Sequence, residues 1–447
     1  MTHTASVEQA KQQLKLLKQQ QGEISGQFKR FAKGSAEQLA LRPQMQAISA
    51  QVKQLQAEIK LAQKQQTAAN EQPATPSMPA YFQPLTQRYQ PEQLTFNSHH
   101  LHQEHLHQKH PKHDEIWQQW FRFCQSHPKA SVYHQQAIHN SILQAFGLDC
   151  SLLIARDPQG QIIGGLPLYT LSSKLFGRFA ISVPYFNYGG PVCDCSQVAT
   201  RLIEKARALL STEQLERIEV RCVQPELGEQ PSDKKVSMLL ALPSDIQQLE
   251  QQLGAKVRAQ YNKADEHKLR VAFGGLELLD DYYRVFSENM RDLGTPVYSK
   301  AWFRTLLEQA SLKATLVCVY HHNKPVATAF LIGFNEVLEI PWASTLRSAN
   351  NLNANMWMYR QVLGFAIEQG YNYFDFGRST RDAGTYRFKK QWGAKAYPHY
   401  WYTLSEQQQA AELNPDNPKY ALMIKVWQRM PVVLTRLLGP HIVRHIG

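Results

Sequence analysis

An acidic side chain lies near the end of an apolar stretch in the last quarter of the sequence. Asp375 falls within a predicted strand, Tyr371–Phe376, and Gly377, Arg378 and Ser379 follow it. A carboxylate at a strand end can orient or deprotonate the acceptor of a transfer reaction. It can equally bond to a turn or cap a helix. The residues alone leave both interpretations open.

A basic run interleaved with aromatic residues comes next: Tyr386, Arg387, Phe388, Lys389, Lys390 and Trp392. We expect a strand here, in which alternation places Tyr386, Phe388 and Lys390 on one face. Arg387 and Lys389 would then share the other face. A pair of basic side chains could bind the phosphate of a nucleotide-linked acceptor or of a lipid diphosphate. The alternative is that these are solvated surface lysines.

Three further stretches supply candidate binding residues: Asn187, Tyr188 and Gly189; Arg258; and Asn289 with Arg291. The glycines at 189 and 190 allow the backbone to approach a ligand closely, or they simply form a turn. Asn289 and Arg291 end a predicted helix, where they could line the same cleft or make local hydrogen bonds.

No metal site is predicted. A histidine cluster (His99, His100, His102, His105, His107, His110 and His113) has no carboxylate or cysteine at a recognised ligand spacing. Cys193 and Cys195 form one C-x-C pair, and no second pair follows to complete a tetrahedral site. The six cysteines are scattered through a large chain, which favours free thiols in a reducing compartment.

The positive charge of the chain is concentrated at its ends. The formal net charge of the 447 residues is +12, of which +6 falls in residues 1–70, +5 in 417–447 and only +1 between them. A hydrophobic content of 43% argues against wholesale disorder. No 18 apolar residues are consecutive, and the first residues lack the pattern of a secretory signal. We therefore expect a cytoplasmic protein.

Residues 1–70 carry two stripes of apolar residues at heptad spacing, which predicts two helices. Gly34 and Ser35 between them suit a helix end and a new helix start. An antiparallel helical hairpin is the simplest arrangement, and a parallel dimeric coil ranks second. Its partner could be a protein or the phosphate backbone of tRNA. Pro43 should kink the second helix or delay its start.

Two other segments flank the predicted body. Residues 71–113 are rich in proline and histidine and are expected to form an extended linker. Residues 405–447 form a basic, amphipathic C-terminal tail. The tail could make peripheral contact with an anionic membrane surface, on the inner face of the cytoplasmic membrane, through residues 417–447. It could instead pack back on the body.

The body repeats one order of elements. Two helices, a hairpin, a third strand, a helix and a closing strand are predicted between residues 114 and 222, and again between 277 and 377. This order predicts two α/β domains with mixed sheets, at 114–232 and 233–404.

Three motifs carry a family resemblance: Tyr185-Phe-Asn-Tyr-Gly-Gly-Pro191, Asn289-Met-Arg-Asp-Leu-Gly-Thr-Pro-Val-Tyr-Ser299, and Phe374-Asp-Phe-Gly-Arg-Ser379 followed by Gly384-Thr-Tyr-Arg-Phe-Lys-Lys-Gln-Trp-Gly393. Together they resemble the FemAB family of transferases, in particular the subgroup associated with PEP-CTERM/exosortase systems. The resemblance covers about residues 114–447. It implies an α/β fold of two tandem GNAT-like mixed-sheet domains, here preceded by the helical hairpin.

The resemblance also implies a function. An acyl or aminoacyl group would be transferred to an amine or hydroxyl of a cell-envelope or exopolysaccharide precursor, with Asp375 and Tyr386 as candidate catalytic residues. The donor would be acyl-CoA, an acyl carrier protein or aminoacyl-tRNA, with no tightly bound cofactor. The pyrophosphate loop typical of acetyl-CoA users is not legible in this sequence. The alternative is a non-catalytic scaffold in envelope or exopolysaccharide assembly that uses the helical arm to bind a partner.

Overall fold

The computed structural model describes residues 2–31, 35–70, 78–85, 94–101, 111–173, 177–223, 227, 231–232, 234–406 and 418–447. The chain divides into two compact units, Met1–Ser77 and Met78–Gly447. Among the described helices, none combines the length and the apolar character that are needed to cross a membrane.

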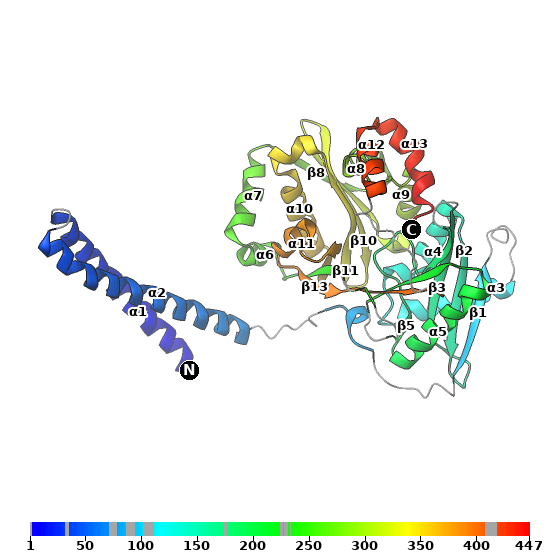
Figure 1. Ribbon diagram of the computed structural model, residues 1–447, viewed down its shortest axis with the longest axis horizontal. Helices are drawn as coiled ribbons and strands as arrows, with labels where there is room; N and C mark the ends of the chain where they lie inside the picture. Colours follow the sequence, from blue (N-terminus) through cyan, green and yellow to red (C-terminus); the bar gives the residue numbers. More distant parts are fainter. Residues whose placement is uncertain are drawn as a thin grey trace. The chain divides into compact units, whose positions relative to one another are not determined.

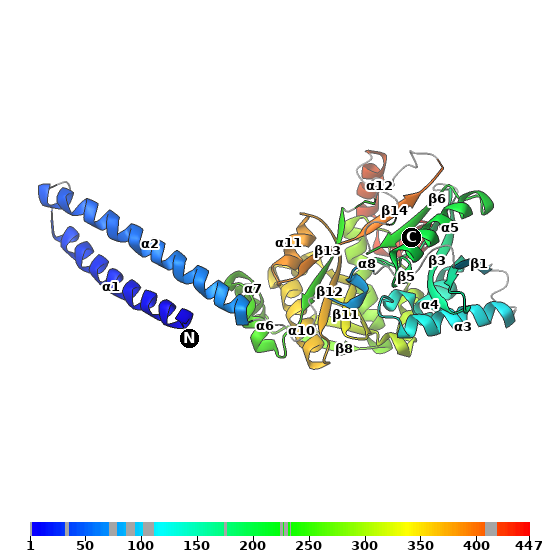
Figure 2. The same ribbon diagram turned by 90° about the horizontal axis from the view of Figure 1, so that it is seen from below.

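The first unit is the predicted antiparallel helical hairpin (Figure 2). Helix α1 spans Thr2–Arg30, and α2 spans Ala36–Asn70 and continues through Pro43. Gln21 Nε2 on α1 donates a hydrogen bond of 2.9 Å to Ser49 Oγ on α2. The heptad pattern therefore gave the correct pairing of these helices.

The second unit contains two seven-stranded mixed sheets (Figure 1). The first sheet has the order β1 (Thr95–Leu101), β2 (Asp149–Arg156), β3 (Ile162–Ser173), β4 (Gly177–Ile181), β6 (Arg217–Cys222) and β14 (Tyr400–Leu404), and β5 (Val192–Cys193) also pairs with β3. The second sheet has the order β13 (Lys395–Pro398), β7 (Lys235–Ala241), β12 (Tyr373–Thr380), β11 (Val337–Thr345), β10 (Lys324–Phe334), β9 (Thr315–His321) and β8 (Arg270–Gly274).

The two sheets repeat one topology. The path β1-β2-β3-β4-β6-β14 corresponds strand by strand to β8-β9-β10-β11-β12-β7, and each path has one parallel pair, β4 with β6 and β11 with β12. The last strand of each path is exchanged. β7 follows the first repeat in the chain but joins the second sheet, while β14 follows the second repeat but joins the first. The exchange ties the two repeats together through backbone hydrogen bonds.

The helices of the second unit are α3 (Pro111–Ser126), α4 (Gln136–Phe146), α5 (Ser196–Thr212), α6 (Ile246–Gln252), α7 (Ala255–Asp265), α8 (Leu279–Leu293), α9 (Lys300–Leu307), α10 (Ala354–Glu368), α11 (Gly384–Lys390), α12 (Pro418–Arg429) and α13 (Val432–Val443). Side chains of both repeats share one aromatic core. Within it, Phe146 lies 5.0 Å from Trp302, and Phe186 lies 5.7 Å from Trp342, measured between ring centroids.

The structure differs from the expected organisation at two places. The expected extended linker over 71–113 is wrong for residues 94–101, because β1 pairs with β2 along its length. It is also wrong at Tyr81 and Phe82, which are buried in the shared core. The sequence of β1 suggested a linker because an edge strand with one solvated face needs few apolar residues. Residues 71–77, 86–93 and 102–110, including the histidines from His102 to His110, lie outside the described residues.

The second difference concerns the boundary at 404. β14 lies within the range expected for the second domain, but it completes the first sheet. In the C-terminal segment, α12 and α13 pack against α8, and Arg436 Nε on α13 donates a hydrogen bond of 2.8 Å to Ser287 Oγ on α8. Tyr185 OH donates to the Arg444 carbonyl at 3.0 Å. Residues 418–447 therefore pack on the rest of the second unit, and the membrane contact expected for this tail stays a prediction.

Candidate functional site

Two buried carboxylates face each other where β11 and β12 stop pairing. In the parallel register, Val337 pairs with Tyr373, Leu338 with Phe374 and Glu339 with Asp375. Both strands continue beyond Glu339 and Asp375, but they no longer pair with each other. On its other edge, β12 shifts register against β7 between Asp375 and Arg378. Gly377 lies in this irregularity with a φ of +73°, a conformation that favours glycine. The two strands therefore separate just after the acidic pair.

Glu339 is held by two donors from the first repeat. Tyr133 OH and Asn187 Nδ2 both donate to Glu339 Oε1, the latter at 2.9 Å. Burial, reinforced by the negative charge of Asp375, raises the pKa of Glu339 to about 8. This carboxyl is therefore mainly protonated at neutral pH.

Asp375 has different surroundings. Its Oδ1 accepts a hydrogen bond of 2.8 Å from the Gly377 N–H, and its buried Oδ2 has no hydrogen-bond partner among the described residues. Burial raises the pKa of Asp375 to about 6, against the opposing effects of the Gly377 N–H, the Lys389 ammonium and the nearby hydroxyl groups of Ser237 and Tyr188. At neutral pH the pair can hold one proton, mainly on Glu339, and leave Asp375 able to accept another.

Lys389 lies next to the acidic pair. Its Nζ donates to the carbonyls of Gly377 at 3.0 Å and Arg378 at 2.9 Å. Because the side chain is buried, the pKa of Lys389 is lowered to about 8. The ammonium group thus fixes the backbone of β12 just beyond Asp375.

The expected strand over Tyr386–Lys390 is wrong, since Gly384–Lys390 forms helix α11. Helical spacing turns Lys389 inward, leaves Arg387 and Lys390 exposed, and packs Tyr386 and Phe388 against the core on the outer face of the second sheet. The predicted separation into faces Tyr386/Phe388/Lys390 and Arg387/Lys389 therefore does not occur. Of this run, only Lys389 contacts the backbone beside Asp375.

Two guanidinium groups lie over the indole of Trp401 on β14. Arg221 and Arg378 place their Cζ atoms 4.7 Å and 4.8 Å from its ring centroid. The buried Arg221 is also bonded to Glu219 Oε1 at 2.6 Å and to the Phe186 carbonyl at 3.0 Å. The Arg378 guanidinium has no hydrogen bond or ion pair among the described residues, and the residue is exposed. Desolvation by the surrounding side chains and the charge of Arg221 nevertheless lower the pKa of Arg378 to about 10. This arrangement suits an anionic group, because one cation is fixed and the other is accessible.

The predicted loop at 187–189 reaches the same region. Tyr188 OH donates to Tyr81 OH at 3.2 Å, and the Tyr188 ring lies 4.9 Å from the ring of Tyr133. The Gly189 N–H donates to the Arg221 carbonyl at 3.0 Å. The sequence-predicted residues Asn187, Tyr188 and Gly189 are thus brought together with Asp375, Arg378 and Lys389.

A buried imidazole borders the Tyr188 side of this region. His399 Nε2 lies 2.8 Å from Ser237 Oγ, and the His399 ring centroid lies 5.6 Å from that of Tyr188. Burial lowers the pKa of His399 to about 3, so the ring is neutral. Nearby on β12, the predicted residue Ser379 is buried, and its Oγ has no partner among the described residues.

Other predicted binding residues have structural partners elsewhere. Arg258 on α7 donates to the carbonyls of Glu250 and Leu253. Trp392 is buried in the outer core, with its ring 6.4 Å from Tyr261 and 6.2 Å from Tyr359.

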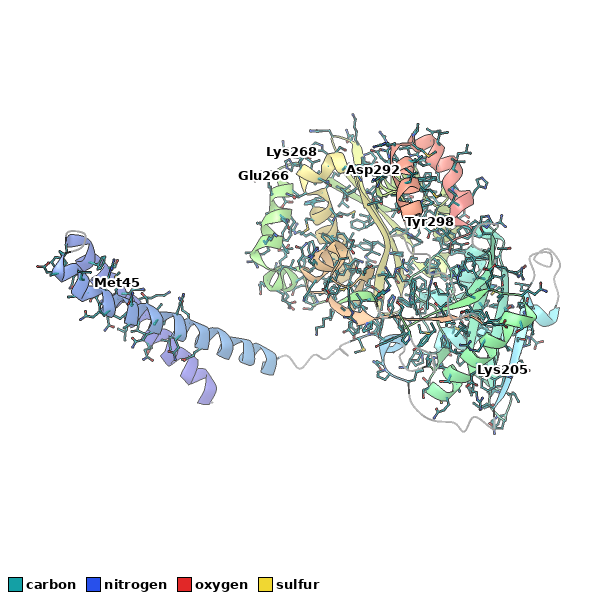
Figure 3. All side chains as sticks on the ribbon, in the orientation of Figure 1. Met45, Lys205, Glu266, Lys268, Asp292 and Tyr298 are labelled. Carbon is teal, nitrogen blue, oxygen red and sulfur yellow. The ribbon has the colours of Figure 1, made fainter. Side chains whose placement is uncertain are left out.

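The two predicted residues at the end of α8 also have local partners. Asn289 donates to the Thr345 carbonyl at 3.1 Å. Arg291 bonds to the carboxylate of Asp292 at 2.6 Å and to the Met430 carbonyl at 3.2 Å. Asp292 is labelled in Figure 3. None of these interactions joins Asn289 or Arg291 to the acidic pair.

Sequence reasoning missed Glu339, Tyr133 and Arg221. The signal for Glu339 was available, since one carboxylate interrupts the otherwise apolar start of the strand at 337–345. A charged residue in a strand buried on both faces requires a partner or a function. Tyr133 and Arg221 gave no comparable signal, because their role depends on contacts with the other repeat.

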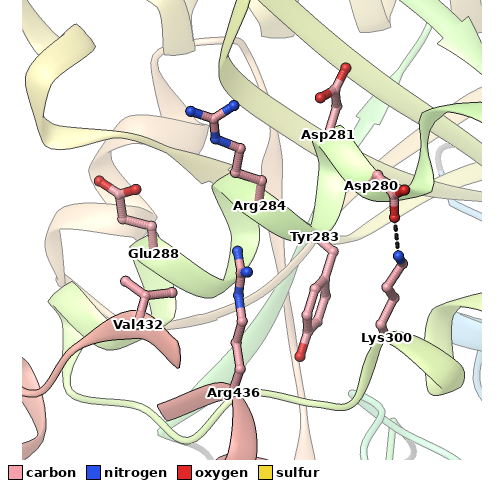
Figure 4. Close-up of a pocket in the computed structure, with 8 residues that line it drawn as sticks. All are labelled: Asp280, Asp281, Tyr283, Arg284, Glu288, Lys300, Val432 and Arg436. Carbon is pink, nitrogen blue, oxygen red and sulfur yellow. Dashed lines mark ion pairs between the residues drawn. The ribbon is translucent and has the colours of Figure 1, made fainter. Parts of the chain in front are cut away.

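A separate groove lies between α8 and α13 (Figure 4). It is lined by Asp280, Asp281, Tyr283, Arg284, Glu288, Lys300, Val432 and Arg436. Lys300 forms an ion pair with Asp280, and the Arg436 guanidinium lies 5.4 Å from the Tyr283 ring centroid. The lining contains none of the residues around Asp375. The described residues contain no group of three histidine, cysteine, aspartate or glutamate side chains that could hold a metal ion.

Residues 252–390 match the family model Acetyltransf_6, an acetyltransferase (GNAT) domain. This range runs from α6 to α11 and includes both members of the acidic pair. The comparison with curated proteins finds no match.

Among solved structures, the chain is similar to FemX, with a TM-score of 0.50 and 13% sequence identity over 69% of this chain and 98% of FemX. It is also similar to the C-terminal domain of a proposed lysylphosphatidylglycerol synthetase from Agrobacterium fabrum, with a TM-score of 0.46 and 12% identity over 70% of this chain and 96% of that domain. At these identities the similarity concerns the fold alone. The chain has two tandem GNAT-like mixed-sheet domains, preceded by an antiparallel helical hairpin.

Proposed function

We propose that this protein is an acyl- or aminoacyl-transferase of the FemAB type. The observation that carries the proposal is the buried pair of Asp375 and Glu339 at the point where β11 and β12 separate, within the range that matches a GNAT acetyltransferase domain. An acyl group would pass to an amine or hydroxyl of a cell-envelope or exopolysaccharide precursor.

In this proposal the Asp375 carboxylate removes the acceptor proton. The acceptor nitrogen or oxygen attacks the acyl carbon, a new bond forms to that carbon, and the bond to the leaving thiol or hydroxyl breaks. The proton passes from the acceptor to Asp375, which then returns it to the departing thiolate or alkoxide. The unbonded Oδ2 of Asp375 and its pKa of about 6 support this role.

Glu339 acts as a positioning residue in this mechanism. It stays protonated while Asp375 is ionised, because burial and the neighbouring charge favour its neutral form. Its bonds to Tyr133 and Asn187 join the loop of the first repeat to the reacting strands of the second. The first repeat thereby helps to shape the acceptor site.

Anionic parts of the acceptor would bind at Arg221 and Arg378. Both guanidinium groups lie on Trp401, and Arg378 is exposed. A guanidinium group can contact two phosphate oxygens at once. A nucleotide-linked or lipid-linked diphosphate is therefore the acceptor class that this arrangement favours.

The subgroup associated with PEP-CTERM/exosortase systems is part of the proposal, on the motif Phe374–Ser379 with Gly384–Gly393 and on the run Asn289–Ser299. The donor classes remain acyl-CoA, acyl carrier protein and aminoacyl-tRNA.

The proposal is tested by incubating the full chain with one donor of each class, and with amine- and hydroxyl-bearing envelope precursors. The expected result is a precursor whose mass increases by one acyl or aminoacyl group in the presence of one donor. Absence of product and of donor binding across all three classes would contradict the transferase and favour the scaffold.

A further inference from the structure

Helix α13 packs with its small side chains inward and its large apolar side chains outward. Thr435, Gly439 and Val443 are buried, and a Cβ at Gly439 would come within 2.7 Å of the Val297 nitrogen. The exposed residues include Val433, at 73% of its surface, and Leu437, at 65%. An ordinary surface helix shows the opposite arrangement.

Helix α12 also exposes apolar side chains. Ile424 faces α8, because a Cβ at Gly294 would come within 2.5 Å of its Cγ2 atom. The exposed apolar residues of both helices are Leu422, Met423, Val426, Val433, Leu434, Leu437, Leu438 and Ile442, and we call them the C-terminal apolar face. Isolated exposed leucines are common on soluble proteins, but a group of eight on two consecutive helices marks an interaction surface.

The charge of this segment is entirely positive. Residues 417–447 contain five lysine or arginine residues and no aspartate or glutamate. Lys425 and Arg429 are exposed on α12 among the apolar side chains, and Arg444 is exposed just after α13. Long basic side chains beside apolar ones suit the boundary between lipid headgroups and acyl chains.

A second copy of this chain is a poor occupant of the C-terminal apolar face. A two-fold contact would place the same surface of each copy against the other. Cations of one segment would then meet cations of the other, without any acidic residue in either segment to pair with them. An anionic lipid surface supplies both the apolar environment and the missing negative charge.

We propose that the C-terminal apolar face docks on the surface of an anionic bilayer, with α12 and α13 lying along the interface. This binding does not depend on the transferase chemistry, since none of these residues belongs to the site around Asp375.

The test is co-sedimentation of the full chain with vesicles of equimolar phosphatidylcholine and phosphatidylglycerol, and with vesicles of phosphatidylcholine alone. The wild type is expected to bind the mixed vesicles, and to bind the neutral vesicles much more weakly. The double substitution Val433→Ser/Leu437→Ser should reduce the partition coefficient for the mixed vesicles by roughly tenfold or more. Lys425→Gln/Arg429→Gln should reduce binding to the mixed vesicles by roughly tenfold and weaken its salt dependence.

The matched control is Leu276→Ser, which changes an exposed leucine on another part of the unit. It should bind as the wild type does. Because all substituted side chains are exposed, the thermal unfolding temperature of each variant should equal that of the wild type. If Val433→Ser/Leu437→Ser fails to fold, Lys425→Gln/Arg429→Gln still tests the proposal. Absence of wild-type binding, or binding of the mixed vesicles by both variants at the wild-type level, would overturn the proposal. A dimer in sedimentation equilibrium that Val433→Ser/Leu437→Ser dissociates would assign the face to self-association instead.

Discussion

Glu339 and Asp375 are the last residues to pair between the parallel strands β11 and β12, and their carboxyl groups have unequal surroundings. Glu339 accepts hydrogen bonds from Tyr133 and Asn187, whereas Asp375 keeps one buried oxygen without a partner among the described residues. Two adjacent carboxyl groups with pKa values driven apart can divide the tasks of holding and accepting a proton.

The raised pKa of Glu339 predicts how stability depends on pH. The folded chain keeps this proton up to about pH 8, whereas an unfolded glutamate loses it near pH 4.5. Between these pH values the folded state binds more protons than the unfolded state does. The contribution of Glu339 to the free energy of unfolding therefore falls by about 1.4 kcal/mol for each unit that the pH rises.

Glu339→Gln removes this titration and keeps an oxygen for Tyr133 and Asn187. Relative to the wild type, the variant should therefore gain stability between about pH 5 and pH 8. Denaturant unfolding of both proteins across this range measures the difference. A stability difference that does not change with pH would contradict a raised pKa at Glu339.

Lys389→Met should destabilise the fold. The substitution leaves the Gly377 and Arg378 carbonyls without their donor, at a cost of about 2 kcal/mol. The exposed neighbour Lys390 provides the control, and Lys390→Met should change the free energy of unfolding by less than about 0.5 kcal/mol. Chemical denaturation measures both, and equal effects would show that the buried contacts of Lys389 contribute little.

Arg378→Gln should weaken binding of a phosphate-bearing acceptor. We expect KM for that acceptor to rise roughly tenfold with little change in kcat, because the guanidinium contacts an anion remote from the acyl carbon. The control is Arg381→Gln, at an exposed arginine just beyond β12. Steady-state kinetics with the acceptor varied would reveal the effect, and an unchanged KM would remove Arg378 from the acceptor site.

Two mid-helix glycines should respond in opposite ways to alanine. Gly439→Ala places a Cβ against the Val297 backbone and should cost about 1–3 kcal/mol and increase hydrogen exchange over 432–443. Gly364 on α10 has only Ile246 Cδ1 near the same position, at 3.9 Å. Gly364→Ala should stabilise the chain by up to about 1 kcal/mol. Stabilisation by both substitutions would contradict the close packing of α13.

The elements that the sequence predicted correctly have local signals. Apolar residues at heptad spacing, interrupted around Gly34, predicted the hairpin of α1 and α2. The repeated order of helices and strands predicted two related mixed sheets. Both inferences rest on periodicity within one segment at a time, which is the strongest signal in a single sequence.

The elements that could not be predicted from the sequence depend on partners far along the chain. The exchange of β7 and β14 between the two sheets follows from pairing of distant strands, which no local pattern specifies. The stretch from Tyr386 to Lys390 alternates aromatic and basic residues, a pattern that suits a short strand as well as a short helix. Burial of Lys389 against Gly377 selects the helix.

The same limit applies to the site. Asp375, Lys389 and Asn187 were identified from motifs, but their grouping with Glu339 required the contact between the two repeats. Arg221 was missed because the first repeat offers no motif around it, and its position on Trp401 depends on the exchanged strand β14.

The central claim is that Asp375 accepts the proton during acyl transfer, and the rate of transfer by Asp375→Asn tests it most directly. The control is Asp382→Asn, at an exposed aspartate in the turn after β12, where asparagine tolerates the φ of +58°. With the donor and acceptor that support turnover, Asp375→Asn should lower kcat by roughly a hundredfold or more at unchanged fold, whereas Asp382→Asn should match the wild type. Transfer by Asp375→Asn at the wild-type rate would contradict the claim.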